Sequence, residues 1–179
     1  ILELQKIENN DRYFLFLKKN NFDDKKITKE NFLKKITNIH WYTLKEQLSL
    51  GKIIDDQKLD LIHFPHWNVP LNIKTPFIVT IHDLILLEEP YSSRTTTRNK
   101  LVHKIKYLAY KKVLKHAITK SKHIITISQY TKDSILKHFP NIASEKITVI
   151  YQGVTKLNTL EEKTSEIKVP DNYLLYIGN

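Results

Sequence analysis

The sequence predicts an α/β domain with a Rossmann-like, mainly parallel, doubly wound sheet. Short apolar runs alternate along the chain with longer segments of helical periodicity, which is the order of elements in βαβ units. Several of the runs are apolar at nearly every position, as expected for strands that helices cover on both faces. With 179 residues, of which 41% are hydrophobic, the chain is long enough for one such domain with a substantial core.

The first half of the chain predicts four strands and two short helices. One helix is expected after Thr28. A second is expected after Thr43, because Thr43 and Glu46 have the spacing of a capping box, in which each side chain bonds a backbone N–H at the helix start. The strands are predicted by apolar runs at residues 13–17, 36–42, 59–64 and 76–81.

The second half predicts three strands and two helices. The strands are expected at residues 123–127, 147–150 and 173–177, and the helices at 130–138 and from about Asn99 to Ser121. On a projection of about 100° per residue, the long helix has an apolar side made of Leu101, Val102, Ile105, Leu108, Ala109 and Val113, opposite Lys100, Lys104, Lys111, Lys115 and Lys122. We expect the apolar side to face the core and the lysine ridge to be solvated. Docking of the ridge on a membrane is the alternative.

These elements suggest a division of the chain into three segments. Residues 1–153 are expected to form a partial N-terminal domain whose first strand is missing, because residues 1–10 resemble the last turns of a helix. Residues 154–171 are polar and rich in Lys, Glu and Thr, which predicts a linker. Since a lone strand is not stable, residues 172–179 are expected to be the first strand of a truncated second domain.

The composition excludes several kinds of site. The chain has no cysteine, so disulfides, thiolate metal sites and cysteine nucleophiles are excluded. No apolar stretch approaches the roughly 20 residues that cross a bilayer as a helix, and the first residues do not form a signal peptide. We therefore expect a soluble, cytoplasmic protein.

The formal charge of +10 comes mainly from lysine, since Arg12, Arg94 and Arg98 are the only arginines. Specific readers of nucleic acid rely on arginine forks, so we expect no specific nucleic-acid partner. Two interpretations of the lysine excess remain open. It is either a compositional bias that favours solubility, or a means of peripheral contact with the anionic inner face of the cytoplasmic membrane.

Polar and aromatic side chains follow four of the predicted strands. In an open parallel sheet, ligands bind beyond the carboxyl ends of the strands, so we expect these residues to share one edge. They are His66 and Trp67, His82 and Asp83, Ser128 and Thr131, and Gly153. Purely structural roles are the alternative, with Ser128 as a helix N-cap and His82 as a hydrogen-bonded histidine of the fold.

Other kinds of site fit the sequence less well. A metal site could be formed by His63, His66 and His82. However, Pro65 disfavours a helix that would place His63 and His66 on one face, and no HExxH pattern is present. We therefore expect no metal. The chain contains 3 glycines, which excludes both a GxGxxG fingerprint and a P-loop.

Five stretches occur in a fixed order along the chain: DLIHFPHWNVPL, PFIVTIHDLILL, HAITKSKHIITISQYTKDSILKHF, KITVIYQGV and YLLYIGN. Together they resemble the amino-terminal half of a GT-B glycosyltransferase of family four. The similarity covers nearly all of residues 11–179. It points to bacterial mannosyltransferase-like enzymes that build lipopolysaccharide or other surface polysaccharides.

The resemblance implies a reaction and its substrates. It implies retaining, metal-independent transfer of a sugar such as mannose from a GDP-sugar or UDP-sugar, which is a donor substrate and not a cofactor. The acceptor would be a saccharide or a lipid-linked saccharide, held by the domain in hand. The cations that grip the diphosphate lie in the other half of such enzymes, so we expect the 179-residue chain alone to be inactive.

The resemblance also implies residue roles. In such enzymes the histidine that corresponds to His82 lies near the reacting centre, with Asp83 orienting its loop. Ser128 and Thr131 would lie along the same cleft, with Gly153 in the turn before the crossover. Tyr151 and Gln152 stand where the family often has Pro-Asn. We assign acceptor contact to His66 and Trp67, because an aromatic face stacks on a sugar ring.

Two other functions remain open at this point. One is a non-catalytic, lysine-rich module that binds anionic lipid or nucleic acid, which rising salt would displace. The other is a metal-dependent hydrolase that uses His63, His66 and His82.

Overall fold

The computed structural model describes residues 1–22, 27–40, 42–90, 100–153 and 172–174. Its strands are β1 (Tyr13–Leu17), β2 (Phe32–Ile36), β3 (Ile62–Phe64), β4 (Phe77–Ile81), β5 (His123–Thr126) and β6 (Ile147–Val149). Its α-helices are α1 (Gly51–Asp55), α2 (Ile85–Glu88), α3 (Lys100–Lys120) and α4 (Gln129–His138). Short turns of other helix types are η1 (Leu4–Lys6), η2 (Lys19–Asn21), η3 (Glu46–Leu50) and η4 (Ser144–Lys146).

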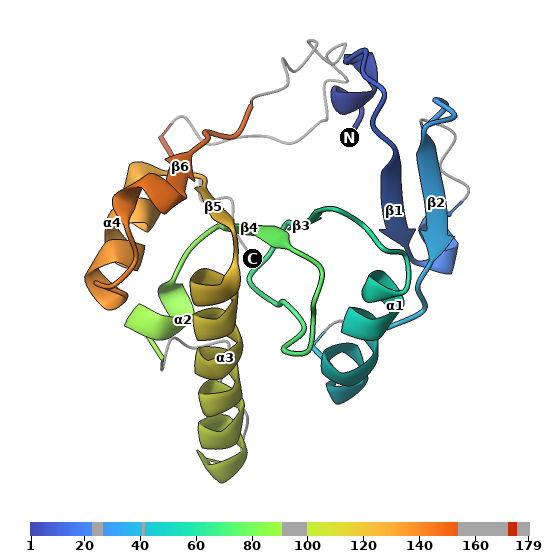
Figure 1. Cartoon of the computed structure of the whole chain (residues 1–179). Coiled ribbons are helices and arrows are strands. Elements are labelled where there is room, and N and C mark those ends of the chain that lie inside the picture. The colour runs from blue at the N-terminus through green and yellow to red at the C-terminus, as the bar shows by residue number, and fades with distance from the viewer. Residues whose placement is uncertain (23–26, 41, 91–99, 154–171, 175–179) are drawn as a thin grey trace.

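The described strands form two parallel sheets, which confirms the predicted α/β class (Figure 1). β1 pairs with β2, and the larger sheet has the order β3-β4-β5-β6. Helices α2 and α3 connect β4 to β5, and α4 connects β5 to β6. Because right-handed crossovers that step in one direction place their helices on one face, α3 and α4 cover the same side of the sheet.

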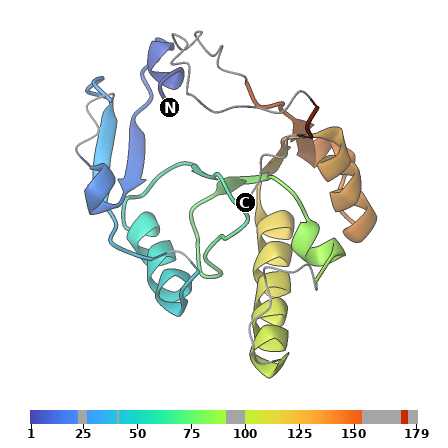
Figure 2. The ribbon, with the colours of Figure 1, turned by 180° about the vertical axis from the view of Figure 1, so that it is seen from behind.

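One face of the larger sheet carries the core. β4 alternates along its length, with Phe77, Val79 and Ile81 buried and Ile78 and Thr80 partly exposed. The buried side chains form one cluster with residues of the helices, including Ile54, Leu114, Ile118 and Ile135. Figure 2 shows the same arrangement from behind, with α1 and α3 on the same side of the sheet.

The opposite face of this sheet is more polar. The His63 ring lies 2.8 Å from Thr80 Oγ1, and the His123 ring lies 2.8 Å from Thr148 Oγ1. Both hydrogen bonds link neighbouring strands, β3 to β4 and β5 to β6. They satisfy polar side chains on a face where Thr148 and His63 are exposed.

The region between β1 and α1 differs from the prediction. The helix expected after Thr28 is absent from the described part of that segment, and the strand expected at 36–42 is replaced by β2 at Phe32–Ile36. The pairing with β1 selects this register, because the Phe32 ring stacks on Tyr13 with 4.5 Å between ring centroids. The apolar residues at 36–42 favoured a strand there, but pairing with β1 places the strand at Phe32–Ile36.

The helix expected after Thr43 is present and uses one of the two bonds of the predicted capping box, while the reciprocal bond goes to Tyr42 N instead of Thr43 N. Glu46 N donates to Thr43 Oγ1 at 3.2 Å, while the Glu46 carboxylate accepts a 2.6 Å bond from Tyr42 N. The helix begins as the π-helical turn η3 and continues as α1. At their junction, a Cβ added to Gly51 would meet the end of the Asn72 side chain and lie 3.2 Å from Ile73 N, so a larger residue here would have to displace the Asn72 side chain.

Helix α2 was not predicted, because its four residues are too few to show a helical period. It is joined to α4 through Glu88. The Glu88 carboxylate accepts hydrogen bonds from Ser134 Oγ at 2.5 Å and Tyr130 Oη at 3.2 Å, and it lies 3.6 Å from His138 Nε2. The bond from Ser134 is the largest of several effects that lower the pKa of Glu88.

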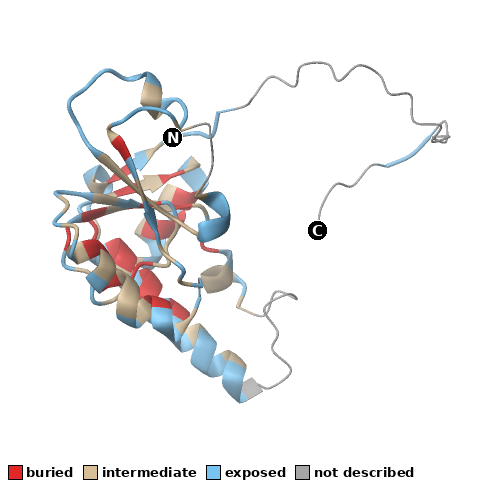
Figure 3. Cartoon of the chain, turned by 90° about the vertical axis from the view of Figure 1, so that its right-hand side faces the viewer, coloured by how far each residue is buried: buried red, intermediate tan, exposed pale blue. Residues whose placement is uncertain are grey.

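Helix α3 lies within one residue of its predicted position. The prediction of its faces is partly right: Val113 is buried and the described lysines of the predicted ridge are exposed, but the other residues of the predicted apolar side are exposed as well. The buried side chains are Tyr110, Val113, Leu114, Ala117 and Ile118. Leu101, Ile105 and Leu108, which were expected to face the core, are 65%, 59% and 52% exposed. Figure 3 shows the reason: the first turns of α3 project beyond the rest of the domain and are mostly exposed.

Helix α4 begins at Gln129, one residue before the prediction, and Ser128 is its N-cap as expected. The expected linker at 154–171 and residues 175–177 of the last expected strand lie outside the described residues, so the proposed domain division stays a prediction. Tyr173 and Leu174 are described, and they are not in a strand. Among the described residues, no helix has both the length and the apolarity needed to cross a membrane.

Candidate functional site

The predicted site residues lie on segments that leave one edge of the larger sheet. All its strands are parallel, so the carboxyl ends of β3, β4, β5 and β6 meet at the same edge. His66 and Trp67 follow β3, His82 and Asp83 follow β4, Ser128 and Thr131 follow β5, and Gly153 follows β6. The structure thus gives the topology that the sequence analysis required.

His82 is tied to the loops on both sides of it. Its Nε2–H donates to the carbonyl of Pro65 at 3.0 Å, in the loop after β3. Its own carbonyl accepts a 2.9 Å bond from Thr131 Oγ1, in the first turn of α4. Because a carbonyl can only accept, the Nε2 proton is fixed, and Nδ1 is the acceptor of the neutral ring. The half-buried imidazole therefore has a set tautomer and orientation.

Ser128 and Thr131 serve this same arrangement. Thr131 N donates to Ser128 Oγ at 3.1 Å, which is the N-cap bond, and the two hydroxyl oxygens lie 2.9 Å apart. Thr131 is buried, and its hydroxyl holds the backbone of His82. In this structure the pair positions the histidine and begins α4, which is the structural role that the sequence analysis left open for Ser128.

Asp83 follows His82 and bonds the start of α2. Its Oδ1 accepts a 3.0 Å bond from Ile85 N, which satisfies a backbone donor at the start of that helix. The side chain is exposed. Its charge also acts on Tyr110, whose pKa is raised first by burial and then by Asp83.

An aromatic cluster lies beside His82. The His66 ring is 6.3 Å from the His82 ring and 4.8 Å from Trp67, measured between ring centroids. Trp67 packs edge-on against the buried Tyr110 at 4.8 Å, and Tyr42 lies 5.6 Å from Trp67. We call Tyr42, His66 and Trp67 the aromatic cluster. It offers partly exposed ring faces of the kind that sugars stack on.

Burial favours a neutral His66. Desolvation, and then the nearby charge of a protonated His82, lower the pKa of His66, while Asp83 acts in the opposite direction. A ring that stays neutral near neutral pH can both donate and accept a hydrogen bond. That suits contact with the hydroxyl groups of a saccharide.

Sequence analysis missed the residues that hold this cluster. Glu46 is 8% exposed, and its carboxylate accepts bonds of 2.6 Å from Asn68 Nδ2 and from Tyr42 N. It thereby joins the loop after β3 to the start of η3. Tyr42 has a φ of 58°, a left-handed conformation that is costly for a bulky residue and that these bonds support. The capping-box spacing gave a signal for Glu46, but Asn68 lies too far along the chain for any local pattern to pair them.

A second anchor fixes the far end of the same loop. Asp55, the last residue of α1, accepts bonds from Thr75 N at 2.8 Å, Thr75 Oγ1 at 2.7 Å and Lys74 N at 3.1 Å. Although burial acts to raise it, these bonds bring the pKa of Asp55 below its ordinary value. The segment that carries His66 and Trp67 is therefore held by both η3 and α1.

The remaining predicted residues are not brought into this group. Gly153 is exposed, and a Cβ added to it would meet open space, so the described local structure makes no demand for glycine there. His63 lies on the open sheet face with Thr80, apart from the pair of His66 and His82. Among the described residues, no group of three or more histidines and carboxylates could hold a metal ion.

Comparison with known proteins gives two findings. A family model described as Glycosyltransferase Family 4 matches residues 27–156, which is more than half of the chain. The chain is also 30% identical over 138 residues to the O-antigen chain mannosyltransferase RfbU of Salmonella typhimurium, a match that covers 77% of this chain. It covers 34% of that relative, so the chain spans about a third of the relative's length.

Proposed function

Because the chain belongs to glycosyltransferase family 4, we propose that it forms the acceptor-side part of an enzyme that transfers a sugar from a nucleotide-sugar donor. The similarity to a protein named as an O-antigen chain mannosyltransferase supports mannose or a similar hexose as the sugar. The donor is a GDP-sugar or UDP-sugar. The acceptor is a saccharide, free or lipid-linked, of a lipopolysaccharide or another surface polysaccharide.

The observation that carries this proposal is the fixed His82 ring beside the aromatic cluster at the sheet edge. The ring is held through Pro65 and Thr131, while His66 and Trp67 stand next to it. A saccharide stacked on Trp67 would present its hydroxyl groups to the two imidazoles. This is the combination of a ring platform and oriented polar groups that sugar sites use.

In the proposed reaction, the bond between the anomeric carbon and the diphosphate oxygen breaks and a bond from an acceptor hydroxyl oxygen to that carbon forms. The hydroxyl proton is released, and the nucleoside diphosphate leaves with the bonding electrons. Transfer is retaining, so the new bond has the configuration of the old one. Because Nε2–H is donated to Pro65, Nδ1 of an unprotonated His82 can accept a hydrogen bond from a sugar hydroxyl and hold it against the reacting carbon.

The leaving diphosphate needs positive charge from elsewhere in the protein. The segments that follow the strands at this edge, residues 65–70, 82–84, 127–131 and 150–153, contain no lysine or arginine. The proposed mechanism is metal-independent, so fixed cations must supply that stabilisation. We therefore assign the acceptor to this part of the enzyme and the diphosphate to another part.

The test is sugar transfer by the purified full-length protein. A lipid-linked saccharide acceptor is incubated with GDP-mannose, and separately with UDP-hexoses, with and without EDTA. We expect one donor to add one hexose mass to the acceptor, to the same extent with EDTA, and the anomeric configuration of the product to match the donor. No added mass with any nucleotide sugar would contradict the proposed activity, and loss of transfer with EDTA would contradict metal independence.

The proposed acceptor gives the protein a place in the cell. Lipid-linked saccharides are assembled on a membrane, so we propose a cytoplasmic protein that makes peripheral contact with the inner face of the cytoplasmic membrane.

A further inference from the structure

The first half of α3 exposes apolar side chains on the side that faces away from the protein. Ile105 and Leu108 are 59% and 52% exposed, and Leu101, one turn earlier, is 65% exposed. At about 100° per residue, this stripe lies about 180° from the centre of the core-facing residues Tyr110, Leu114 and Ala117. Exposed apolar side chains that follow one another along a single helix face make that face a candidate docking surface.

The charge around the stripe has one sign. The sequence of α3 contains no aspartate or glutamate. Lys104, Lys111, Lys112 and Lys115 are all exposed, and on the same projection they lie within about 90° of the centre of the stripe. Apolar side chains flanked by lysines on one helix face are the arrangement that lies in the interface of an anionic bilayer. We call these residues, with Ile105 and Leu108, the outward face of α3.

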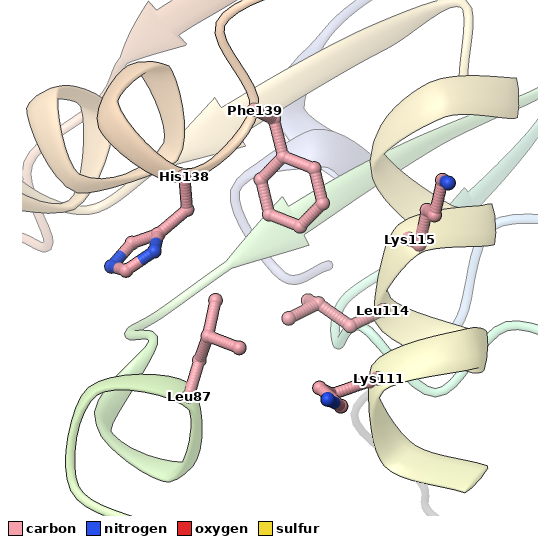
Figure 4. A pocket seen from close by; sticks show the side chains of 6 residues that line it. All are labelled: Leu87, Lys111, Leu114, Lys115, His138 and Phe139. Carbon is pink, nitrogen blue, oxygen red and sulfur yellow. The ribbon is translucent and has the colours of Figure 1, made fainter. Parts of the chain in front are cut away.

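A groove next to this face extends the same chemistry. It has a volume of about 200 Å³ and lies between α2, α3 and α4, with Leu87, Leu114 and Phe139 as its apolar lining and Lys111, Lys115 and His138 around them (Figure 4). Lys111 also covers the Tyr107 ring, at 4.9 Å from its centroid. The two lysines that belong to both surfaces join the groove to the outward face of α3.

We propose that the outward face of α3 is a docking surface for a bilayer that contains anionic phospholipid. Ile105 and Leu108 enter the boundary between headgroups and acyl chains, and the lysines reach lipid phosphates while their alkyl stems lie along the apolar surface. This proposal rests on the proposed function in one respect: an acceptor carried by a membrane requires the enzyme to contact that membrane. The binding itself needs no sugar donor.

The charge pattern favours lipid over a second copy of the chain. In a symmetric dimer formed through this face, the lysines of one copy would meet the lysines of the other, and like charges at close range oppose association. An anionic bilayer complements every charge on the face. Each lysine near such a surface strengthens binding by about fivefold at moderate salt.

The test is sedimentation of the full-length protein with vesicles, without sugar nucleotide. Vesicles of phosphatidylcholine are compared with vesicles that also contain phosphatidylglycerol. We expect binding to the anionic vesicles, and this binding should weaken as salt rises. The Ile105→Ser and Leu108→Ser double variant should bind them at least about tenfold more weakly than the unaltered protein. Replacing Lys104, Lys112 and Lys115 by Gln should weaken binding more than tenfold and reduce its salt dependence.

A matched control comes from another exposed pair one helical turn apart. Leu44 and Leu48 are 81% and 72% exposed near η3, so a Leu44→Ser and Leu48→Ser variant removes similar apolar surface from another place. Its vesicle binding should equal that of the unaltered protein. Circular dichroism and the melting temperature should be unchanged in both double variants, because all four side chains are exposed.

Each other outcome overturns the proposal. These are an absence of binding to anionic vesicles, equal binding to neutral ones, binding that the α3 variants leave intact, or a self-association in sedimentation equilibrium that those variants abolish. Transfer to a water-soluble acceptor keeps the two ideas separate. The Ile105→Ser and Leu108→Ser variant should retain this transfer. A failure of vesicle binding would therefore not contradict the proposed activity, and a failure of sugar transfer would not contradict membrane docking.

Discussion

At the scale of single residues, His82 is tied at the sheet edge through both its ring and its backbone. Its ring nitrogen bonds the loop after β3, and its carbonyl bonds the first turn of α4. A histidine fixed in this way can be structural, or it can be held ready for a substrate. The two roles differ in what a substitution changes.

We expect His82→Ala in the full-length enzyme to lower kcat by roughly a hundredfold or more, the effect of losing one preoriented polar group at a reacting centre. The melting temperature should fall only slightly, because the ring is half-buried and makes one hydrogen bond. Transfer kinetics and thermal unfolding are measured on the same preparation. His63→Gln, on the open sheet face, is the control and should keep full kcat. Unchanged turnover with a large loss of stability would make His82 a structural residue.

Residue-level prediction succeeded where the signal was local. Ser128 was recognised as an N-cap, and the bond between Thr43 and Glu46 N was predicted from the capping-box spacing, because each pattern lies within four residues. The bond from Asn68 to Glu46 and the left-handed backbone of Tyr42 were not predictable. Both depend on where a distant loop comes to rest, which no short window of sequence contains.

At the scale of elements, the link between α2 and α4 depends on one charged group. Glu88 of α2 accepts bonds from Ser134 and Tyr130 of α4. α2 has four residues, too few to be stable as an isolated helix. Its position therefore depends on this carboxylate and on the apolar contacts of Leu86 and Leu87 with the core.

We expect Glu88→Gln to reduce the free energy of unfolding at pH 7 by about 1 kcal/mol, because the hydrogen bonds lose their charged acceptor while the site remains partly exposed. The pKa of Glu88 is lowered in the folded protein from its ordinary 4.5. The stabilisation is thus fully present above pH 4.5 and is lost as the pH falls through the lower, folded pKa.

Urea unfolding of both proteins between pH 7 and pH 3 measures this difference. The two stabilities should converge at the acid end of the range. Ser134→Ala should produce a loss with the same pH dependence, whereas Glu89→Gln, at an exposed neighbouring carboxylate, should produce none. A difference that stays constant with pH would mean that the charge of Glu88 is not what joins the two helices.

The elements of the larger sheet were the most predictable part of the fold. β4, β5, β6 and α4 lie within a few residues of their expected positions, since each has a strong period and a clear start. The limits are shown by β2 and α3. The register of β2 was set by its pairing with β1. Helix α3 has apolar residues on two sides, and which side is buried depends on where the sheet packs against the helix.

At the scale of the whole molecule, the segments that follow the strands at the sheet edge lack the lysine and arginine charges that a leaving diphosphate needs. We expect the 179-residue chain by itself to transfer no sugar, even where the full-length protein is active. Both proteins are incubated with radiolabelled GDP-mannose and the acceptor, and the labelled product is counted. Transfer by the 179-residue chain would contradict our assignment of the diphosphate to another part of the protein.

The order of the strands in the larger sheet is the order in which they occur in the chain. Each of these strands can therefore pair with the one made just before it, and none must wait for a partner still to be synthesised. The ribosome releases the chain from its amino end at about 5–20 residues per second, which is slow compared with hairpin or helix formation. The sheet can thus grow during translation, one βα unit at a time.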